Sequence, residues 1–485
     1  MNLVADSRSW TETELPQSSC RRHPLVYYHV MNNRMPTENV APLKIAIAGS
    51  GIAGLAAGWL LAKEGHQVTV FEKQASLGMD AHGWDLLDHP LSADLANSVS
   101  EMGPLRIDVP PRLFNPQLWP NLVQLYQQAG IETVPIDPTK CYCNDDRTSY
   151  LRLKRGYQPA WTDLWRSRSR MIAHHSRRLL VLARQWQQAQ NWPTGTLREL
   201  WQEHRFPEAY VQFFLYPALA STVCTCDYAA LDNYPAAIVL PALLQMIDGS
   251  ELHRTRLGSR DVVQRLSQGL DIQLNACVSQ AQRVLEQDWD SNHHASGIRL
   301  QINGQEQWFD HLIVATQANH VASIVDDLTT QERVTLEGFQ YVQAPVVLHN
   351  DKQWMPRRRS DWSHFNIFLQ PQATTHSATQ AACTMWMNCF RDDWNWAGDL
   401  FQTIMPLQPP NPSAILATAV LQRPVVTLES WLLWDSLNTI QQQPDRCLWF
   451  CGSYASPGIP LLQSGVASAQ AIASRILQSR HAQAR

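Results

Sequence analysis

The sequence predicts an α/β fold in which one nucleotide-binding domain is assembled from separated segments of the chain. Residues 43–73 follow the order strand, glycine-rich turn, helix and strand. Near the C-terminus, residues 446–477 return to a strand, a glycine and a helix. Because the chain between these segments is far longer than one crossover connection, we expect it to build a second, inserted α+β domain.

The composition is that of a large globular protein. The chain has 485 residues, of which 45% are hydrophobic and 17% charged, so two or three folding units with a sizeable core are expected. The formal net charge of −4 gives no overall attraction to polyanions, and we predict no nucleic-acid partner. The ten cysteines do not suggest a disulfide framework and favour a reduced, cytoplasmic protein. Two Cys-x-Cys pairs, Cys141/Cys143 and Cys224/Cys226, lack the spacing usual for zinc, and no metal is predicted.

The first 42 residues differ in character from the rest of the chain. They contain no basic start followed by an apolar stretch, so they are not a secretory signal. We expect a loose tail. Met35, shortly before the first strand, is an alternative start, which leaves open whether the first 34 residues belong to the native protein.

Residues 43–49, LKIAIAG, have the apolar, β-branched character of a buried parallel strand. The strand ends at Gly49, and the spacing Gly49-x-Gly51-x-x-Gly54 opens the helix that follows. Gly49 permits a tight turn, Gly51 a close approach of the backbone to a pyrophosphate, and Gly54 close packing of helix on strand. Glu72 ends the next strand, where a carboxylate accepts hydrogen bonds from ribose hydroxyls. This order predicts a Rossmann-type dinucleotide site.

The same apolar stretch could also be read as a membrane span. Glycine and serine cluster in its middle, and Lys63-Glu64 close it too early to cross a bilayer. The nucleotide-binding interpretation is therefore the stronger one.

Later segments alternate between the two expected domains. Strand patterns recur at 272–284, 297–304 and 308–318, whereas residues 105–250 look mostly helical and 326–435 mix strand and loop. We predict a three-layer nucleotide-binding domain from 43–104, 251–325 and 436–485, and a substrate domain from 105–250 and 326–435, after the tail 1–42.

Several stretches resemble the flavin-containing amine oxidase superfamily, and within it a branch known as predicted NAD/FAD-binding oxidoreductases. The matching stretches are IAIAGSGIAGLAAGWLLAKEGHQVTVFEK, IDVPPRLFNPQLWPNLVQLYQQAGI, LIVATQANHV, VVLHNDKQWMPRRRSDWSHFN, MWMNCF and LWFCGSYASPGIPLLQSGVASA. The glycine motif alone does not separate FAD from NAD, but the C-terminal segment that returns to close the site favours FAD.

The resemblance implies FAD bound in an extended form. It places near the pyrophosphate and ribose Gly49, Ser50, Gly51, Ile52, Ala53, Gly54, Glu72 and Lys73. It places near the adenine Val278, along the dinucleotide Ala315 and Thr316, and toward the flavin Gly452, Ser453, Leu461 and Leu462.

The chain departs from the superfamily at four places. Met79 stands where a phosphate-facing arginine is usual, and Ser453 where an acid follows the C-terminal glycine. The stretch QAPVVLHND has no lysine before Lys352, and the position of a flavin-facing tyrosine falls near Pro457. These departures argue against amine oxidation.

Two features are candidates for substrate contact. In LHNDKQWMPRRRSDW, His349 and Arg357 belong to a cluster that could bind an anionic head group or form a solvated loop. His82 follows the first nucleotide-binding unit and is a further candidate.

Residues 152–184 are rich in arginine. Apolar residues recur there at roughly helical spacing, namely Trp161, Leu164, Trp165, Ile172, Leu179, Leu182 and Trp186. This pattern fits a domain helix with its apolar side packed inward, or a helix lying on an anionic membrane. The first is favoured, and peripheral membrane contact stays open.

The predicted function is FAD-dependent oxidation, of oxidase or desaturase type, in which hydride leaves a C–H bond of a small substrate. The branch is similar to the flavin-binding part fused to some cyclopropane fatty acid synthases, which favours an apolar, lipid-like substrate. The alternatives are a redox-neutral flavoenzyme of isomerase or mutase type and a non-catalytic FAD-binding protein. Catalytic residues, electron acceptor and oligomeric state are not predicted.

Overall fold

Five parallel strands form the sheet that carries the glycine turn. The computed structural model describes residues 41–85, 106–156, 158–163, 165–285, 296–369, 380–391, 394–395 and 398–483, all within the unit Pro36–Arg485. In the sheet order β11-β2-β1-β15-β21, the strands are β1 (Lys44–Ala48), β2 (Gln67–Phe71), β11 (Asp271–Gln273), β15 (His311–Val314) and β21 (Leu448–Phe450). All neighbouring pairs are parallel. The α/β class is confirmed. Of the predicted tail, residues 1–40 lie outside the described part.

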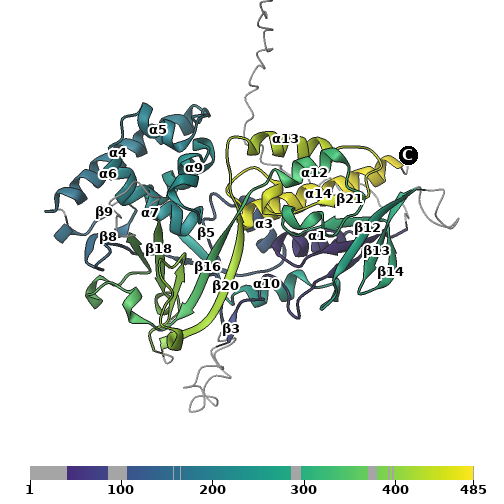
Figure 1. Ribbon diagram of the computed structural model, residues 1–485, viewed down its shortest axis with the longest axis horizontal. Coiled ribbons are helices and arrows are strands. Elements are labelled where there is room, and N and C mark those ends of the chain that lie inside the picture. The colour runs from purple at the N-terminus through teal and green to yellow at the C-terminus, as the bar shows by residue number, and fades with distance from the viewer. Residues whose placement is uncertain are drawn as a thin grey trace, which may run out of the picture. The chain divides into compact units, whose positions relative to one another are not determined.

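Helices cover one face of this sheet. The helices are α1 (Ile52–Lys63), α3 (Pro120–Gln128), α10 (Ser259–Leu266) and α14 (Leu462–Gln483), and α1 packs along α14 (Figure 1). Alternate residues of β1 face in opposite directions, as in any strand. Ile45 and Ile47 pack toward α1, and Ala46 and Ala48 belong to the core on the other side.

A second, antiparallel sheet lies on that other side. Its strands, in order, are β12 (Val278–Leu285), β13 (Ser296–Ile302) and β14 (Gln305–Phe309). Phe71 of β2 meets Phe309 of β14 edge to face, with ring centroids 5.8 Å apart. Helices, parallel sheet and antiparallel sheet therefore form three layers.

A buried carboxylate links the antiparallel sheet to helix α12 (Thr330–Glu337). Glu332, which is 1% exposed, accepts hydrogen bonds from Arg283 of β12 at 2.6 Å and from Arg446 at 2.8 Å. Glu332 also completes a capping box with Thr329 at the start of α12. Helix α12 packs in turn on α13 (Ser430–Ile440).

An eight-stranded sheet forms the base of the second domain. Its order is β20-β16-β19-β18-β17-β7-β8-β9, and its strands are β7 (Lys140–Cys143), β8 (Ser149–Arg155), β9 (Gln158–Pro159), β16 (Tyr341–His349), β17 (Phe365–Leu369), β18 (Ala381–Trp386), β19 (Phe401–Ile404) and β20 (Ile415–Pro424). Strands β7, β8 and β9 lie in the stretch predicted to be mostly helical. Tyr142 and Leu151 are fully buried in these strands. The spacing of apolar residues in the sequence did not by itself assign this segment to strands.

Short strands join the two domains. They are β3 (Trp84–Asp85) with β4 (Arg106–Ile107), and β5 (Leu113–Phe114) with β10 (Leu252–Thr255) and β6 (Thr133–Ile136). Helix α3, which follows β5, packs on α14 of the nucleotide-binding layer. The exact domain limits remain a prediction.

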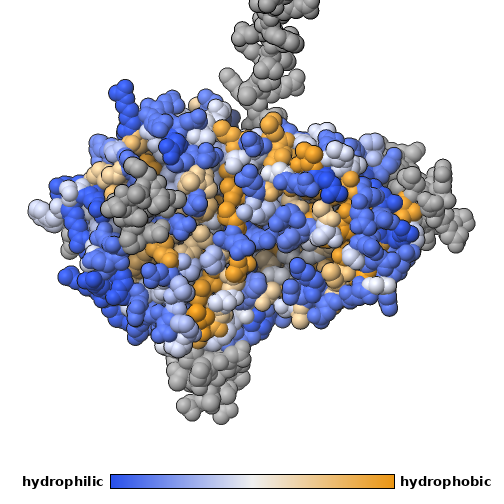
Figure 2. Space-filling model, viewed as in Figure 1, coloured by the Kyte–Doolittle hydropathy of each residue, from blue (hydrophilic) through white to orange (hydrophobic). Residues whose placement is uncertain are grey.

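Helices cover the eight-stranded sheet in the view of Figure 1. They are α4 (Ser167–Gln188), α5 (Leu197–Glu203), α6 (Glu208–Tyr210), α7 (Tyr216–Ala218), α8 (Tyr228–Asp232) and α9 (Ala236–Asp248). Two π-helical turns, Val211–Leu215 and Leu219–Val223, flank α7. A short α11 (Ala318–Val321) follows β15. Within the described ranges, no helix has both the length and the apolar character needed to cross a bilayer. On the face shown in Figure 2, hydrophilic residues dominate, and hydrophobic ones gather near its middle.

Candidate functional site

One cavity connects the glycine turn with the inserted domain. Its volume is about 910 Å³. Residues from β1, β2, α1 and the start of α14 line one end, and residues from β16, β17, β18, β20 and the helical cover line the other. A single space therefore reaches from the predicted dinucleotide site into the predicted substrate domain.

The glycine turn has the geometry that a tight strand-to-helix connection demands. Gly49 has φ of 104°, a left-handed conformation that side chains rarely adopt, and its N–H donates to Phe71 O at 2.9 Å. A Cβ on Gly54 would lie 2.1 Å from Gly49 O, so only glycine fits there. Gly54 does not line the cavity; it lets α1 start directly against the turn.

Gly51 differs from these two glycines. Its φ is −65°, and nothing lies within 4 Å of the position that its Cβ would take. It is the N-cap of α1, no side chain caps the helix, and its first turn has no acidic residue. Open space therefore faces the free N–H groups and partial positive charge of a helix start, which suits a phosphate group.

Glu72 ties the turn to the next strand. The carboxylate is 8% exposed and accepts from Ser50 N at 3.1 Å, from Ser50 Oγ at 2.5 Å and from Gln74 N at 3.0 Å. Ser50 Oγ itself accepts from Gly78 N at 2.8 Å. The acid therefore lies at the cavity wall beside the turn, where the resemblance places an adenosine ribose.

The other residues predicted to contact FAD gather on the same cavity. Its lining includes Gly49, Ser50, Gly51, Ile52, Ala53, Glu72, Lys73, Val278, Ala315, Thr316, Gly452, Ser453, Leu461 and Leu462. They come from six separate stretches of chain. The open helix start and the lining together fit an extended dinucleotide, although the contact of each residue with FAD remains a prediction.

Ion pairs of Asp80 and Asp85 hold the loop around Met79, where the resemblance would place a phosphate-facing arginine. Met79 lines the cavity and is 6% exposed. Arg106 contacts Asp80 and Asp85, each at 2.6 Å, and Arg260 contacts the same two acids at 3.2 and 3.1 Å. Two arginines and two aspartates thus form a closed ring that fixes the loop.

His349 and Arg357 do not line the cavity, and this geometry gives no support to their predicted contact with substrate. His349 is fully buried in β16, where Asp351 N donates to its Nδ1 at 3.2 Å and its Nε2 lies 2.8 Å from Thr403 Oγ1. Burial lowers the pKa of His349 to about 4, although Asp351 opposes this shift. Arg357 is exposed and lies 3.9 Å from Asp146.

The rest of this arginine-rich stretch also holds structure together. Arg359 makes two hydrogen bonds of 2.9 Å to Asp399 and lies over the Trp362 ring. Lys352, the first lysine after the stretch QAPVVLHND, pairs with Asp399 at 3.1 Å. The charged side chains of this stretch therefore form a local ion-pair network and show no sign of a ligand site.

His82, in contrast, lines the cavity. Its pKa is lowered by partial burial and by the nearby Arg112 guanidinium. Near neutral pH His82 therefore stays mainly uncharged.

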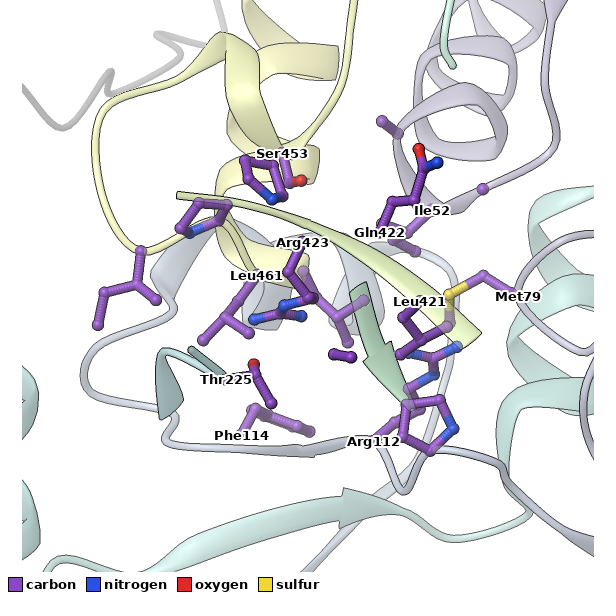
Figure 3. A pocket seen from close by; sticks show the side chains of 18 of the residues that line it. Ile52, Met79, Arg112, Phe114, Thr225, Leu421, Gln422, Arg423, Ser453 and Leu461 are labelled. Carbon is purple, nitrogen blue, oxygen red and sulfur yellow. The ribbon is translucent and has the colours of Figure 1, made fainter. Parts of the chain in front are cut away.

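Other lining residues were not among the predicted site residues. Figure 3 shows Arg112, Phe114, Thr225, Leu421 and Arg423 around the chamber. Thr225 is β-branched but has φ of 53°, a strained backbone of the kind that gathers at functional sites. Cys224 and Cys226 beside it are buried, and within the described residues no group of three or more His, Cys, Asp or Glu could hold a metal.

Lys140, at the start of β7, is a further lining residue that sequence reasoning missed. Burial lowers its pKa to about 8. A lysine that is partly neutral near this pH can exchange a proton with a molecule in the cavity.

Comparisons with known proteins agree with this geometry. The sequence model of a family described as flavin containing amine oxidoreductase matches residues 52–393. A 1-hydroxycarotenoid 3,4-desaturase of Flavobacterium sp. (strain P99-3) is 38% identical over 110 residues, which are 22% of this chain and 19% of the desaturase. The chain thus matches only a small part of that relative's length.

Solved structures of low sequence identity share the fold. Cyclohexylamine oxidase from Brevibacterium oxydans IH-35A has a TM-score of 0.58 and 13% identity, covering 91% of this chain and 100% of the oxidase. A fatty acid isomerase from P. acnes that produces CLA has a TM-score of 0.60 and 13% identity, covering 89% of this chain and 98% of the isomerase.

Proposed function

Because the chain belongs to the flavin-containing amine oxidoreductase family and is an FAD-dependent oxidoreductase, we propose that it removes hydride from a C–H bond of a small, apolar substrate. One observation carries the proposal. A single cavity extends from the glycine turn to a chamber with apolar walls between the helical cover and the eight-stranded sheet. A cofactor bound along the turn can therefore meet a substrate held in the chamber.

FAD would lie with its pyrophosphate at the start of α1 and its flavin toward the C-terminal segment. Gly49 and Gly51 would receive the pyrophosphate, Glu72 the ribose, and Ser453 and Leu461 the flavin end. Bound FAD supplies a two-electron acceptor for hydride. Such an acceptor would take the hydride from a substrate C–H bond as a proton leaves the neighbouring atom and a double bond forms, and O2 or another acceptor would then take up the two electrons.

The chamber favours an apolar substrate over an amine. Its walls include Phe114, Ile367, Met385 and Leu421. Its charged side chains include Arg112, Lys140 and Arg423 against one carboxylate, Asp137, and this excess of positive charge would disfavour a protonated amine. This charge agrees with the departures of the sequence from the amine oxidase pattern.

Flavin spectroscopy on the purified protein tests the proposal. We expect a yellow protein whose flavin bleaches under anaerobic conditions with a lipid extract and stays oxidised with a panel of primary amines. A colourless protein that takes up no added FAD would refute the proposal. Bleaching by dithionite alone, with activity on lipid appearing only afterwards, would instead favour a redox-neutral isomerase.

We also infer peripheral contact with anionic membranes, through two exposed tryptophans before α4. The favoured prediction of a helix with its apolar side packed inward agrees with α4, where Ile172 and Leu179 are each 1% exposed, but Trp161 and Trp165 before it are each 84% exposed. Arg166, Arg170 and Arg177 are exposed nearby. Tryptophan beside arginine suits the interface of an anionic bilayer.

The position of α4 supports this inference, because α4 packs on α9, which lines the cavity with Ala242, Gln245 and Met246. Vesicle flotation tests it. We expect binding to phosphatidylglycerol vesicles that weakens strongly in a Trp161→Gln/Trp165→Gln variant, and no binding to neutral vesicles. Equal flotation of both proteins would contradict it. The cytoplasmic location remains a prediction.

A further inference from the structure

Two arginines from distant parts of the chain face the same chamber. Arg112 lies just before β5, and Arg423 lies near the end of β20. Both line the cavity, and Figure 3 shows their side chains reaching into it, with Leu421 and Thr225 nearby. Neither residue belongs to the glycine turn or to the C-terminal segment that would hold the flavin.

The charge of Arg112 has no direct counter-ion. No described carboxylate lies within ion-pair distance of it, and its Nε is buried without a hydrogen-bond partner among the described residues. Asp108 acts on it electrostatically, but both Asp108 oxygens accept from Ser259 N, at 3.0 and 3.1 Å. The guanidinium fork therefore keeps donors available toward the cavity.

Arg423 is in a similar position. Its one recorded hydrogen bond within the described residues runs from Nη2 to Val223 O at 3.5 Å, close to the limit for such a bond. Around it lie the neutral side chains of Cys224 and Tyr234, and Arg112 acts on it unfavourably. Arginine stays charged even where burial lowers its pKa, so two like charges share one apolar chamber.

Such an arrangement is costly in the absence of an anion. A buried charge needs a partner and hydrogen bonds, and two buried cations raise the cost further. A carboxylate between two guanidinium groups satisfies both, because each group offers parallel N–H donors that match its oxygens. Apolar side chains such as Phe114, Ile367 and Leu421 line the same chamber, which suits a hydrocarbon body for the rest of the ligand.

We propose that Arg112 and Arg423 bind the carboxylate of an apolar acid, so that the substrate is a carboxylic acid with a hydrocarbon body. This inference rests on the proposed function, because it names the substrate class of the same cavity. The head group would be anchored at the arginine pair, and the hydrocarbon would lie along the apolar walls toward the cofactor.

Equilibrium dialysis with four C12 ligands tests the pair: dodecanoate, dodecan-1-ol, dodecylamine and dodecyl phosphate. We expect dodecanoate to bind at least tenfold more tightly than each of the others. Arg112→Met and Arg423→Met should each weaken dodecanoate about 10- to 100-fold, as expected for loss of hydrogen bonds to a charged group. Binding of the alcohol should change less than twofold.

Arg333→Met is the matched control. Arg333 is exposed on α12, pairs with Glu337 four residues on and does not line the cavity, so dodecanoate binding should not change. If either methionine variant fails to fold, Arg112→Lys or Arg423→Lys replaces it, because lysine keeps the positive charge but lacks the parallel N–H donors of arginine. We then expect an intermediate loss of dodecanoate affinity.

Several results would overturn the inference. They are equal affinity for acid and alcohol, tightest binding of the amine or the phosphate, or unchanged dodecanoate binding in both methionine variants. FAD content, read from absorbance in parallel, separates this failure from failure of the proposed function. A colourless protein with arginine-dependent dodecanoate binding would refute the flavin chemistry and retain the head-group site. Loss of FAD in Arg112→Met would assign that residue to the cofactor.

Discussion

Gly51→Ala separates the needs of the fold from the needs of the cofactor. In the protein alone, the added methyl group meets nothing within 4 Å, and φ of −65° suits any L-residue. Replacing glycine also lowers the entropy of the unfolded chain, which stabilises a protein by about 0.4–1 kcal/mol. Alanine is less favourable than glycine at an N-cap, which offsets this gain, so the apoprotein should stay within about 1 kcal/mol of the wild type.

FAD binding, in contrast, should weaken. The open space at Gly51 is where the pyrophosphate would approach the backbone, so a methyl group there would push the phosphates away from the start of α1. Loss of one hydrogen bond to a charged phosphate is worth about 1.5–3 kcal/mol, a decrease in FAD affinity of about 10- to 100-fold.

Denaturant unfolding of apoprotein and titration with FAD measure these two quantities. Gly65→Ala is the matched control, because its Cβ position is also open but its φ is 85°. It should cost about 1–2 kcal/mol of stability and leave FAD affinity unchanged. Wild-type FAD affinity in Gly51→Ala would refute the assignment of the turn to the pyrophosphate. A clearly destabilised Gly51→Ala apoprotein would refute the geometric argument.

Three further substitutions probe other parts of the molecule. Gly54→Ala should reduce both stability, by about 1–3 kcal/mol, and FAD affinity, because its Cβ would lie 2.1 Å from Gly49 O; unfolding and FAD titrations with wild-type values would contradict this. His349 has a pKa of about 4 in the folded protein and about 6.5 when unfolded, so stability is complete above pH 6.5 and falls by up to about 3 kcal/mol toward pH 4. His349→Gln should flatten that dependence in denaturant titrations, and an unchanged slope would count against it. Arg446→Met should cost about 3 kcal/mol in the same assay, because Glu332 stays buried with one partner fewer; a loss below 1 kcal/mol would argue otherwise.

The nucleotide-binding half of the fold was predictable because its signals are local. The turn from Gly49 to Gly54 and the acid Glu72 follow from spacing within one strand–helix–strand unit. The return of the chain at Gly452 was visible as a second strand followed by glycine and a helix. The structure brings Gly452 and the turn to one cavity.

The substrate end could not be predicted in the same way. Arg112 stands in the stretch IDVPPRLFNPQLWPNLVQLYQQAGI, which carries part of the family resemblance, but nothing in the sequence links it to Arg423. Only the folding of β5 and β20 around one chamber brings the two arginines together. For His349 and Arg357 the reverse holds, because they are close in sequence but the fold separates them from the cavity. Sequence proximity suggested a shared ligand, but β16 directs His349 into the sheet, and Arg357 remains on the surface.

The ring of Arg106, Asp80, Arg260 and Asp85 has a consequence for how the cofactor is acquired. Three separate parts of the chain meet in it, at 80–85, 106 and 260, so protein contacts alone hold the loop around Met79. Preorganisation of this kind removes the entropic cost of ordering a loop during association. Calorimetry of FAD binding should then show a smaller change in heat capacity than binding that is coupled to the folding of a segment.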